Sequence, residues 1–234
     1  MLPEFVMKLS LPILLSFCAA SAGAAQLTET ETRWLQAGAP VLAYAKQELN
    51  LPIDIIVQPQ AGPNDVPLAM GFADGRCKLV FSMRGNPQAE EVLAGVPAAQ
   101  QKVLIEAMTA HEVGHCWRQA HGSWHAVPAG FVEGSLQQLA SPELQELSKQ
   151  IRDTRREEAF ADLVALAWTQ RANAAQYPQV HAWLMQVRQP VEHGSHNTRA
   201  WLQLARSATV FDSERNPFEQ ARALWAQGLL KDGQ

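Results

Sequence analysis

The sequence contains no run of basic residues and, apart from one segment near its N-terminus, no long run of apolar ones. Its 234 residues include 19 Lys and Arg and 23 Asp and Glu, which gives a formal net charge of −4 at pH 7. This charge balance does not favour binding to nucleic acid or to an anionic membrane surface. Internal repeats, low-complexity tracts and linker-like segments are also missing, so the length favours a single domain.

The one apolar run, residues 9–20, follows Lys8 and is followed by small residues up to Ala25. A basic residue, a short apolar run and small residues in this order are typical of a secretory signal peptide. We therefore assign residues 1–25 to a signal peptide and 26–234 to one mature domain, which export would place in the periplasm.

This apolar run is too short to cross a bilayer, and no other stretch is long enough, so we expect no integral membrane segment in the mature chain. A lipid anchor at Cys18 is disfavoured, because the preceding Phe17 is bulky where such signals require a small residue.

Cysteine is scarce, and removal of the signal peptide leaves only Cys77 and Cys116. Two cysteines in an oxidising compartment favour one disulfide, which would contribute on the order of 3–4 kcal/mol for a loop of this length. The alternative is two unpaired buried thiols.

Hydrophobic periodicity predicts a helix, then a small sheet, then a part of the chain that is almost entirely helical. Ser141-Pro142-Glu143 has the pattern of a helix start, but the sequence leaves open whether one helix or two follow it. The class is therefore α+β, mainly α, with a small N-terminal β-sheet packed on the helix at 97–120. The predicted strands are 53–57, 68–72 and 77–83, and the other helices are 28–49, 174–187, 198–208 and 218–230.

The most informative motif, His111-Glu112-Val113-Gly114-His115, lies inside the helix predicted at 97–120. Residues four apart share one face of a helix, so the two imidazoles can reach one metal ion. Glu112 lies one position round the helix, near enough to take a proton from a metal-bound water. This is the pattern of zinc metallopeptidases, in which the glutamate is the general base.

A catalytic zinc site takes three protein ligands and a water, so a third ligand is required. We favour Glu158, because Asp162 lies four residues later on the same helical face. Asp162 can then accept a hydrogen bond from the far nitrogen of a ligand histidine. Ala159 and Ala161 are small and would let this helix pack closely against the first.

His121 and His125 are alternative third ligands. His121 has the spacing of metzincins, but Arg118 stands where they carry a glycine and favours continued helix. On a continuing helix His121 would lie about 9 Å beyond His115 and could not share the ion.

The segments 111–115 and 158–162 together resemble the gluzincin metallopeptidases. The resemblance is greatest to the branch that contains the CAAX-prenyl proteases, the heat-shock membrane proteases and their soluble periplasmic relatives. It implies a zincin-like fold, with Zn²⁺ bound by His111, His115 and Glu158.

That branch also has a later His-Pro motif with an arginine six residues after the histidine. His193 and Arg199 keep this spacing, although Gly194 replaces the proline. The resemblance therefore implies that His193 and Arg199 lie near the cleft. Together with His196 they are our candidates for stabilising an oxyanion.

These patterns predict a secreted zinc metalloendopeptidase with Glu112 as general base and a peptide or protein as substrate. An extended peptide would pair with the strand at 77–83 if that strand formed a sheet edge. One alternative is a non-catalytic, zinc-stabilised binding or chaperone-like module in the periplasm. Another is a zinc amidase that acts on non-protein amides such as cell-wall material. Glu112 favours an enzyme, since a structural zinc site needs no base.

Overall fold

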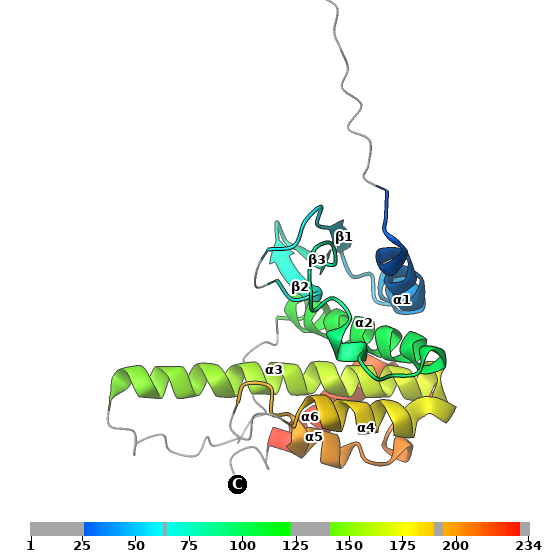
Figure 1. Cartoon of the computed structure of the whole chain (residues 1–234). Helices are drawn as coiled ribbons and strands as arrows, with labels where there is room; N and C mark the ends of the chain where they lie inside the picture. Colours follow the sequence, from blue (N-terminus) through cyan, green and yellow to red (C-terminus); the bar gives the residue numbers. More distant parts are fainter. Residues whose placement is uncertain (1–25, 63–64, 123–140, 190–193, 230–234) are drawn as a thin grey trace, which may run out of the picture.

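The computed structural model describes residues 26–62, 65–122, 141–189 and 194–229. These residues form six α-helices, three short 3₁₀ turns and one three-stranded sheet, which confirms the predicted α+β, mainly α class (Figure 1). The predicted signal peptide, Cys18, His125 and His193 lie outside the described residues. Within the described ranges, no helix combines the length and apolar character needed to cross a membrane.

The sheet has the strand order β1-β3-β2, with β1 at Ile53–Val57, β2 at Leu68–Ala73 and β3 at Arg76–Phe81. β1 pairs in parallel with β3, and β2 pairs antiparallel with β3. The turn between β2 and β3 consists of Asp74 and Gly75, both with positive φ, as two-residue hairpins require. The predicted strand at 77–83 is therefore the middle strand. The edge position that the sequence permitted for it is excluded, because β1 and β2 pair on its two sides.

Helix α1 (Glu29–Gln47) begins with a capping box, in which Thr28 and Glu31 each accept the other's backbone N–H. The 3₁₀ turn η1 (Glu91–Leu93) then leads from the sheet to α2 (Ala98–Ala120), the helix that carries the His-Glu-x-x-His motif. α2 lies between the layer formed by α1 and the sheet and the layer that begins with α3 (Figure 1).

Helix α3 (Pro142–Ala172) is one continuous helix of 31 residues, which resolves the question that the sequence left open. Its start is as predicted, with the hydroxyl of Ser141 accepting the N–H of Leu144. The first half projects beyond the rest of the protein, whereas most residues from Arg156 onward are buried (Figure 1). The elements after it pack on its far side: η2 (Ala174–Gln176), α4 (Tyr177–Val187), α5 (Arg199–Leu204), η3 (Ala208–Val210) and α6 (Pro217–Leu229).

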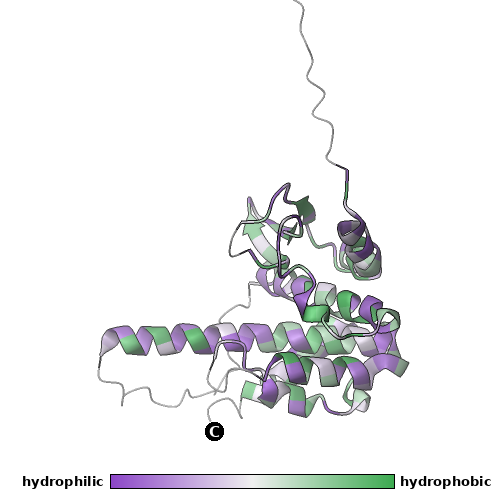
Figure 2. Ribbon diagram, in the orientation of Figure 1, coloured by the Kyte–Doolittle hydropathy of each residue, from purple (hydrophilic) through white to green (hydrophobic). Residues whose placement is uncertain are grey.

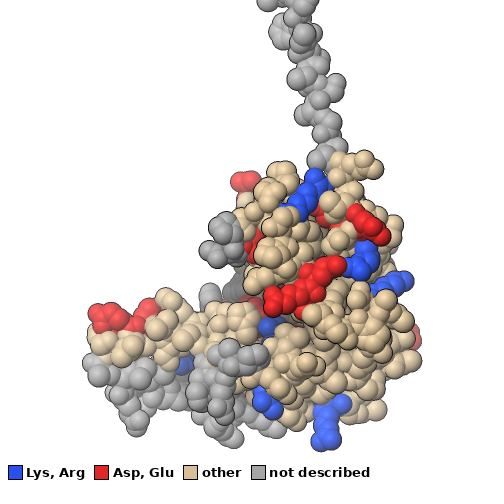
Figure 3. All heavy atoms as spheres, viewed as in Figure 1, with Lys and Arg blue, Asp and Glu red and all other residues tan. Residues whose placement is uncertain are grey.

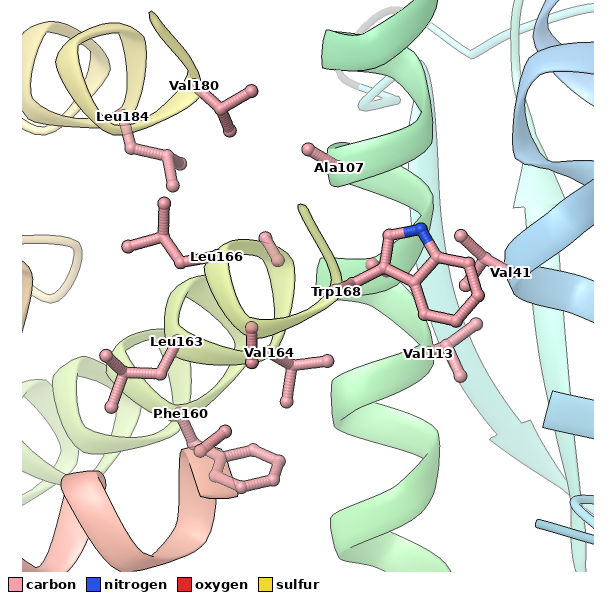
Figure 4. Close-up of a cluster of buried hydrophobic side chains, with 14 of the residues drawn as sticks. Val41, Ala107, Val113, Phe160, Leu163, Val164, Leu166, Trp168, Val180 and Leu184 are labelled. Carbon is pink, nitrogen blue, oxygen red and sulfur yellow. The ribbon is translucent and has the colours of Figure 1, made fainter. Parts of the chain in front are cut away.

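The core is centred on the crossing of α2 and α3. Figure 4 shows apolar side chains of α3 meeting those of α2 and α1 on one side and of α4 on the other, among them Val41, Val113, Val164, Trp168 and Leu184. In Figure 2 both long helices carry hydrophobic residues in bands separated by hydrophilic ones, as amphipathic helices do. Gly114 allows the close approach, because a Cβ there would lie 3.2 Å from the Cα of Ala161.

A disulfide joins Cys77 at the start of β3 to Cys116 on α2, as the cysteine count predicts. Cys116 directly follows His115, so the bond connects the sheet to the helix that carries the motif. Both cysteines are buried.

Candidate metal centre

His111, His115 and Glu158 converge on one point, with ligand atoms that all lie within 4.8 Å of one another. The two Nε2 atoms are 3.1 Å apart, and the carboxylate oxygens of Glu158 lie 3.5 Å from Nε2 of His111 and 3.6 Å from Nε2 of His115. Two ligands at ordinary zinc distances in a tetrahedral arrangement are roughly 3.3 Å apart. The donor types and their spacing therefore fit one zinc-sized cation.

The secondary structure explains this convergence. The histidines are one helical turn apart on α2, so their rings project from the same face. Glu158 approaches from α3, which comes close at Gly114 and Ala161. Ala161, one of the two small residues predicted to permit close packing, is therefore at the point where the two helices meet.

Asp162 supports the first histidine. Its Oδ1 lies 3.0 Å from Nδ1 of His111, which directs Nε2 towards the convergence point. Thr198 donates its hydroxyl to Oδ2 of Asp162 at 2.6 Å, and Arg188 contacts both carboxylate oxygens. A buried carboxylate with these partners is held in one orientation.

Arg188 is a site residue that the sequence did not identify. It ends α4, and besides Asp162 its guanidinium donates to Oε2 of Glu158 at 3.1 Å. One guanidinium thus holds both a candidate ligand and the carboxylate behind His111. No motif surrounds Arg188 in the sequence, so only the packing of α4 against α3 reveals its role.

The second histidine has its own carboxylate, which the sequence also did not identify. Nδ1 of His115 lies 3.0 Å from Oε1 of Glu157. Glu157 directly precedes Glu158 within a highly charged stretch, and such stretches usually form solvated surfaces. Here Glu157 is buried, and its other oxygen lies 3.0 Å from Nε of Arg118.

The electrostatics of the cluster favour positive charge. Burial by itself lowers the pKa of His111, but hydrogen bonds to Asp162 and Glu158 outweigh it and raise that pKa to about 10. Burial likewise raises the pKa of Glu158, but His111 and Arg188 reverse this and lower it to about 2. A field that holds a proton this firmly also attracts a divalent cation in the proton's place.

Glu112 lies beside this cluster, at the junction of α2 and the sheet. Removal from water raises the pKa of its carboxylate above the usual value, and the backbone N–H of Met70 on β2, which faces the carboxylate, offsets part of this rise. A carboxylate with a raised pKa is closer to the range in which it can both accept and return a proton near neutral pH.

The other candidates are placed differently. Arg199 begins α5, and its side chain is exposed and does not line the cleft. His196 does line the cleft, with Nε2 3.7 Å from Oε2 of Glu158. His121 ends α2, where its ring stacks on Trp117 and is not part of the converging group.

The converging group opens into a cleft of about 1380 Å³ between β2, α2, α3 and α4. One wall is the edge strand β2, and apolar side chains of α2 and α4 form much of the rest, including Met108, Trp183 and Leu184. This volume exceeds that of typical small-molecule pockets and suits several residues of a peptide. On the face drawn in Figure 3 the described acidic and basic side chains are interspersed, without a continuous basic surface.

No protein-family model, curated protein or solved structure matches this chain. Function is therefore inferred from the residues of the site.

Proposed function

We propose that this protein is a metal-dependent peptide hydrolase, a zinc metallopeptidase of gluzincin type. The observation that carries the proposal is the convergence of His111, His115 and Glu158 at the floor of a cleft, with Glu112 beside them. The resemblance of the segments 111–115 and 158–162 to gluzincins supports it.

Zn²⁺ suits a donor set of two imidazole nitrogens and one carboxylate oxygen better than Ca²⁺ or Mg²⁺, which prefer oxygen ligands. A zinc ion held there would act as a Lewis acid and lower the pKa of water. His111, His115 and Glu158 would hold it, while Asp162 and Glu157 orient the two imidazoles.

Glu112 performs the proton transfers in this proposal. It accepts a proton from water as the water oxygen bonds to the carbonyl carbon of the substrate. It then returns that proton to the amide nitrogen as the C–N bond breaks, which releases an amine and a carboxylic acid, and the acid passes its remaining proton to the amine or to solvent. Its raised pKa supports both steps, because a very strong acid would not accept the first proton readily.

The edge strand β2 offers a place for an extended substrate. In an antiparallel pair the backbone groups of alternate residues face away from the partner strand. On β2, counted back from the turn, these residues are Phe72, Met70 and Leu68. All three line the cleft, and Met70 already directs its N–H to Glu112. A peptide laid along β2 would therefore have its backbone beside the general base.

The disulfide supports a location in an oxidising compartment such as the periplasm. Export, the signal peptide and the absence of a lipid anchor remain predictions from residues 1–25.

Two other functions would use the same centre. In a non-catalytic binding or chaperone-like module the metal would only stabilise the fold, but such a site has no use for Glu112 and usually has four protein ligands. A zinc amidase would use the same chemistry on cell-wall amides. The open edge of β2 favours an extended peptide over such amides as the substrate.

The test compares the purified protein with Glu112→Gln. We expect one zinc per chain in both, measured by elemental analysis, and hydrolysis of casein by the unaltered protein only. Loss of a general base should reduce the rate at least about 100-fold. The matched control is Glu91→Gln, which alters an exposed carboxylate that lines the same cleft and should retain activity.

Zinc binding without hydrolysis of casein or of cell-wall fragments would support the non-catalytic module. Hydrolysis of cell-wall fragments alone would support the amidase. A protein that binds no zinc would overturn the proposal altogether.

A further inference from the structure

The two histidines are supported in the same way. Each presents Nδ1 to a carboxylate, and each carboxylate lies against an arginine. For His111 these partners are Asp162 and Arg188. For His115 they are Glu157 and Arg118, and this second set belongs to no motif in the sequence.

The second set is buried. Glu157 is 8% exposed and Arg118 is 3% exposed, although both side chains are charged. Arg118 comes from α2, one helical turn beyond His115 on the ligand side of the helix, and Glu157 comes from α3. Removing two charges from water is costly, and an apolar pair of similar size would often pack there at least as well. Packing alone therefore does not account for this buried pair.

Two aromatic rings hold Arg118 in place. The centre of its guanidinium lies 4.3 Å from the ring centroid of Trp225 and 5.2 Å from that of Phe160. Trp225 is itself fixed, since its indole N–H donates to the carbonyl of Arg156 at 2.7 Å. Contacts between a cation and aromatic faces strengthen when they are removed from water, so this arrangement holds the guanidinium in one orientation.

The contact has a direct consequence for His115. When Nδ1–H donates to Glu157, the lone pair of the ring lies on Nε2, and that atom points to Nε2 of His111 and to Glu158. A carboxylate in this position fixes both the tautomer and the orientation of a ligand histidine. The carboxylate must itself stay in place, and Arg118 lies against its second oxygen.

We infer that Glu157 is the positioning residue for His115 and that Arg118, held by Trp225, keeps Glu157 in place. The centre thus depends on α6, which contributes no candidate ligand. This inference rests on the proposed metal centre and concerns its assembly, not the reaction that it performs.

The experiment measures the zinc dissociation constant by competition with a chromophoric chelator, and the absorption spectrum of the Co²⁺-substituted protein. Glu157→Gln should weaken zinc binding about 10–100-fold, as is typical when the partner of a ligand histidine is lost. It should also change the Co²⁺ spectrum. Trp225→Leu should change both quantities in the same direction but less, because it acts through Arg118.

Glu106→Gln is the matched control. Like Glu157, Glu106 is a buried carboxylate, but it belongs to α2. It accepts the indole N–H of Trp168 at 2.8 Å and lies away from the candidate ligands. The substitution should lower thermal stability and leave both the zinc dissociation constant and the Co²⁺ spectrum unchanged. A role of Glu157 in stability alone would make Glu157→Gln behave like this control.

If Glu157→Gln does not fold, Arg118→Lys is measured instead, because it keeps the charge while losing the planar contact with the rings. Weaker zinc binding would then support the inference. Unchanged zinc binding in the variant that folds would overturn it and leave the proposed function intact. Failure of the unaltered protein to bind zinc would overturn the proposed function first.

Discussion

Helix α2 meets the rest of the protein at two junctions that differ in construction. Against α3 it packs closely, through Gly114 and Ala161, and the contact carries the candidate metal ligands and buried ion pairs. Against the sheet it is held by the disulfide Cys77–Cys116 and by the contact of Glu112 with Met70. The first junction brings the candidate ligands together, whereas the second places Glu112, the proposed general base, beside β2, the proposed substrate strand.

This difference implies that metal binding and turnover can be separated by mutation. All three candidate ligands belong to the α2–α3 junction, so damage to the sheet should spare the metal. Damage to α3 should remove the metal and, with it, any hydrolysis.

The largest expected effect comes from Glu158→Gln at the α2–α3 junction. The substitution keeps the shape of the side chain but removes an anionic ligand, so zinc binding should weaken by more than the roughly 100-fold expected for an outer partner. Hydrolysis should fall below detection. Zinc content after dialysis and casein cleavage measure the two effects.

Asp153→Asn is the control for this substitution, since Asp153 lines the same cleft from the same helix outside the converging group. It should bind zinc as the unaltered protein does. Full zinc content in Glu158→Gln would show that Glu158 is not a ligand.

The next effect comes from replacing both cysteines with alanine at the junction with the sheet. The bond closes a sequence separation of 39 residues, so its loss should lower the free energy of unfolding by roughly 4 kcal/mol. The value of kcat/KM should decrease as β2 loosens from α2, while the zinc dissociation constant stays within about 3-fold, because no ligand lies on the sheet. Urea denaturation, peptide cleavage and chelator competition measure the three quantities.

A zinc affinity that declines in parallel with kcat/KM would show that the two junctions are not independent. That result would mean that the sheet also positions the ligands.

The prediction with the least bearing on hydrolysis is a pH dependence in the stability of the metal-free protein. The pKa of His111 is raised from 6.5 to about 10, so its contribution to stability is complete below pH 6.5 and is lost as the pH rises through 10. Chelator-treated protein should therefore unfold at a lower urea concentration at pH 10 than at pH 6. His111→Asn should reduce this difference, and zinc-loaded protein should show less of it because the cation replaces the proton. An equal difference in His111→Asn would assign the effect to other groups.

Much of the fold follows from local patterns. β1 has the predicted bounds, and α2 begins one residue after its prediction and ends where expected. The helix at 198–208 was predicted too long, since α5 ends at Leu204 and a separate 3₁₀ turn follows. The 3.6-residue and two-residue periods decide the type of an element but give little information about where it ends.

The candidate ligands followed from the sequence because their spacing is a property of single helices. His111 and His115 share a helical face wherever that helix lies, and the interval between Glu158 and Asp162 has the same property. The parts that the sequence missed are contacts between helices. Arg188 reaches Asp162 from α4, and Arg118 lies beside Glu157 only because α2 and α3 cross at one particular point.

The sequence by itself determined the motif and the amphipathic helices, because these depend on spacing along the chain, and it favoured Glu158 over His121 and one disulfide over two free thiols. Only the tertiary structure decided which strand forms the edge beside Glu112 and which arginines hold the two carboxylates behind the histidines. Those choices depend on how helices and strands pack against one another, and a buried charge reveals its partner only once distant segments have been brought together.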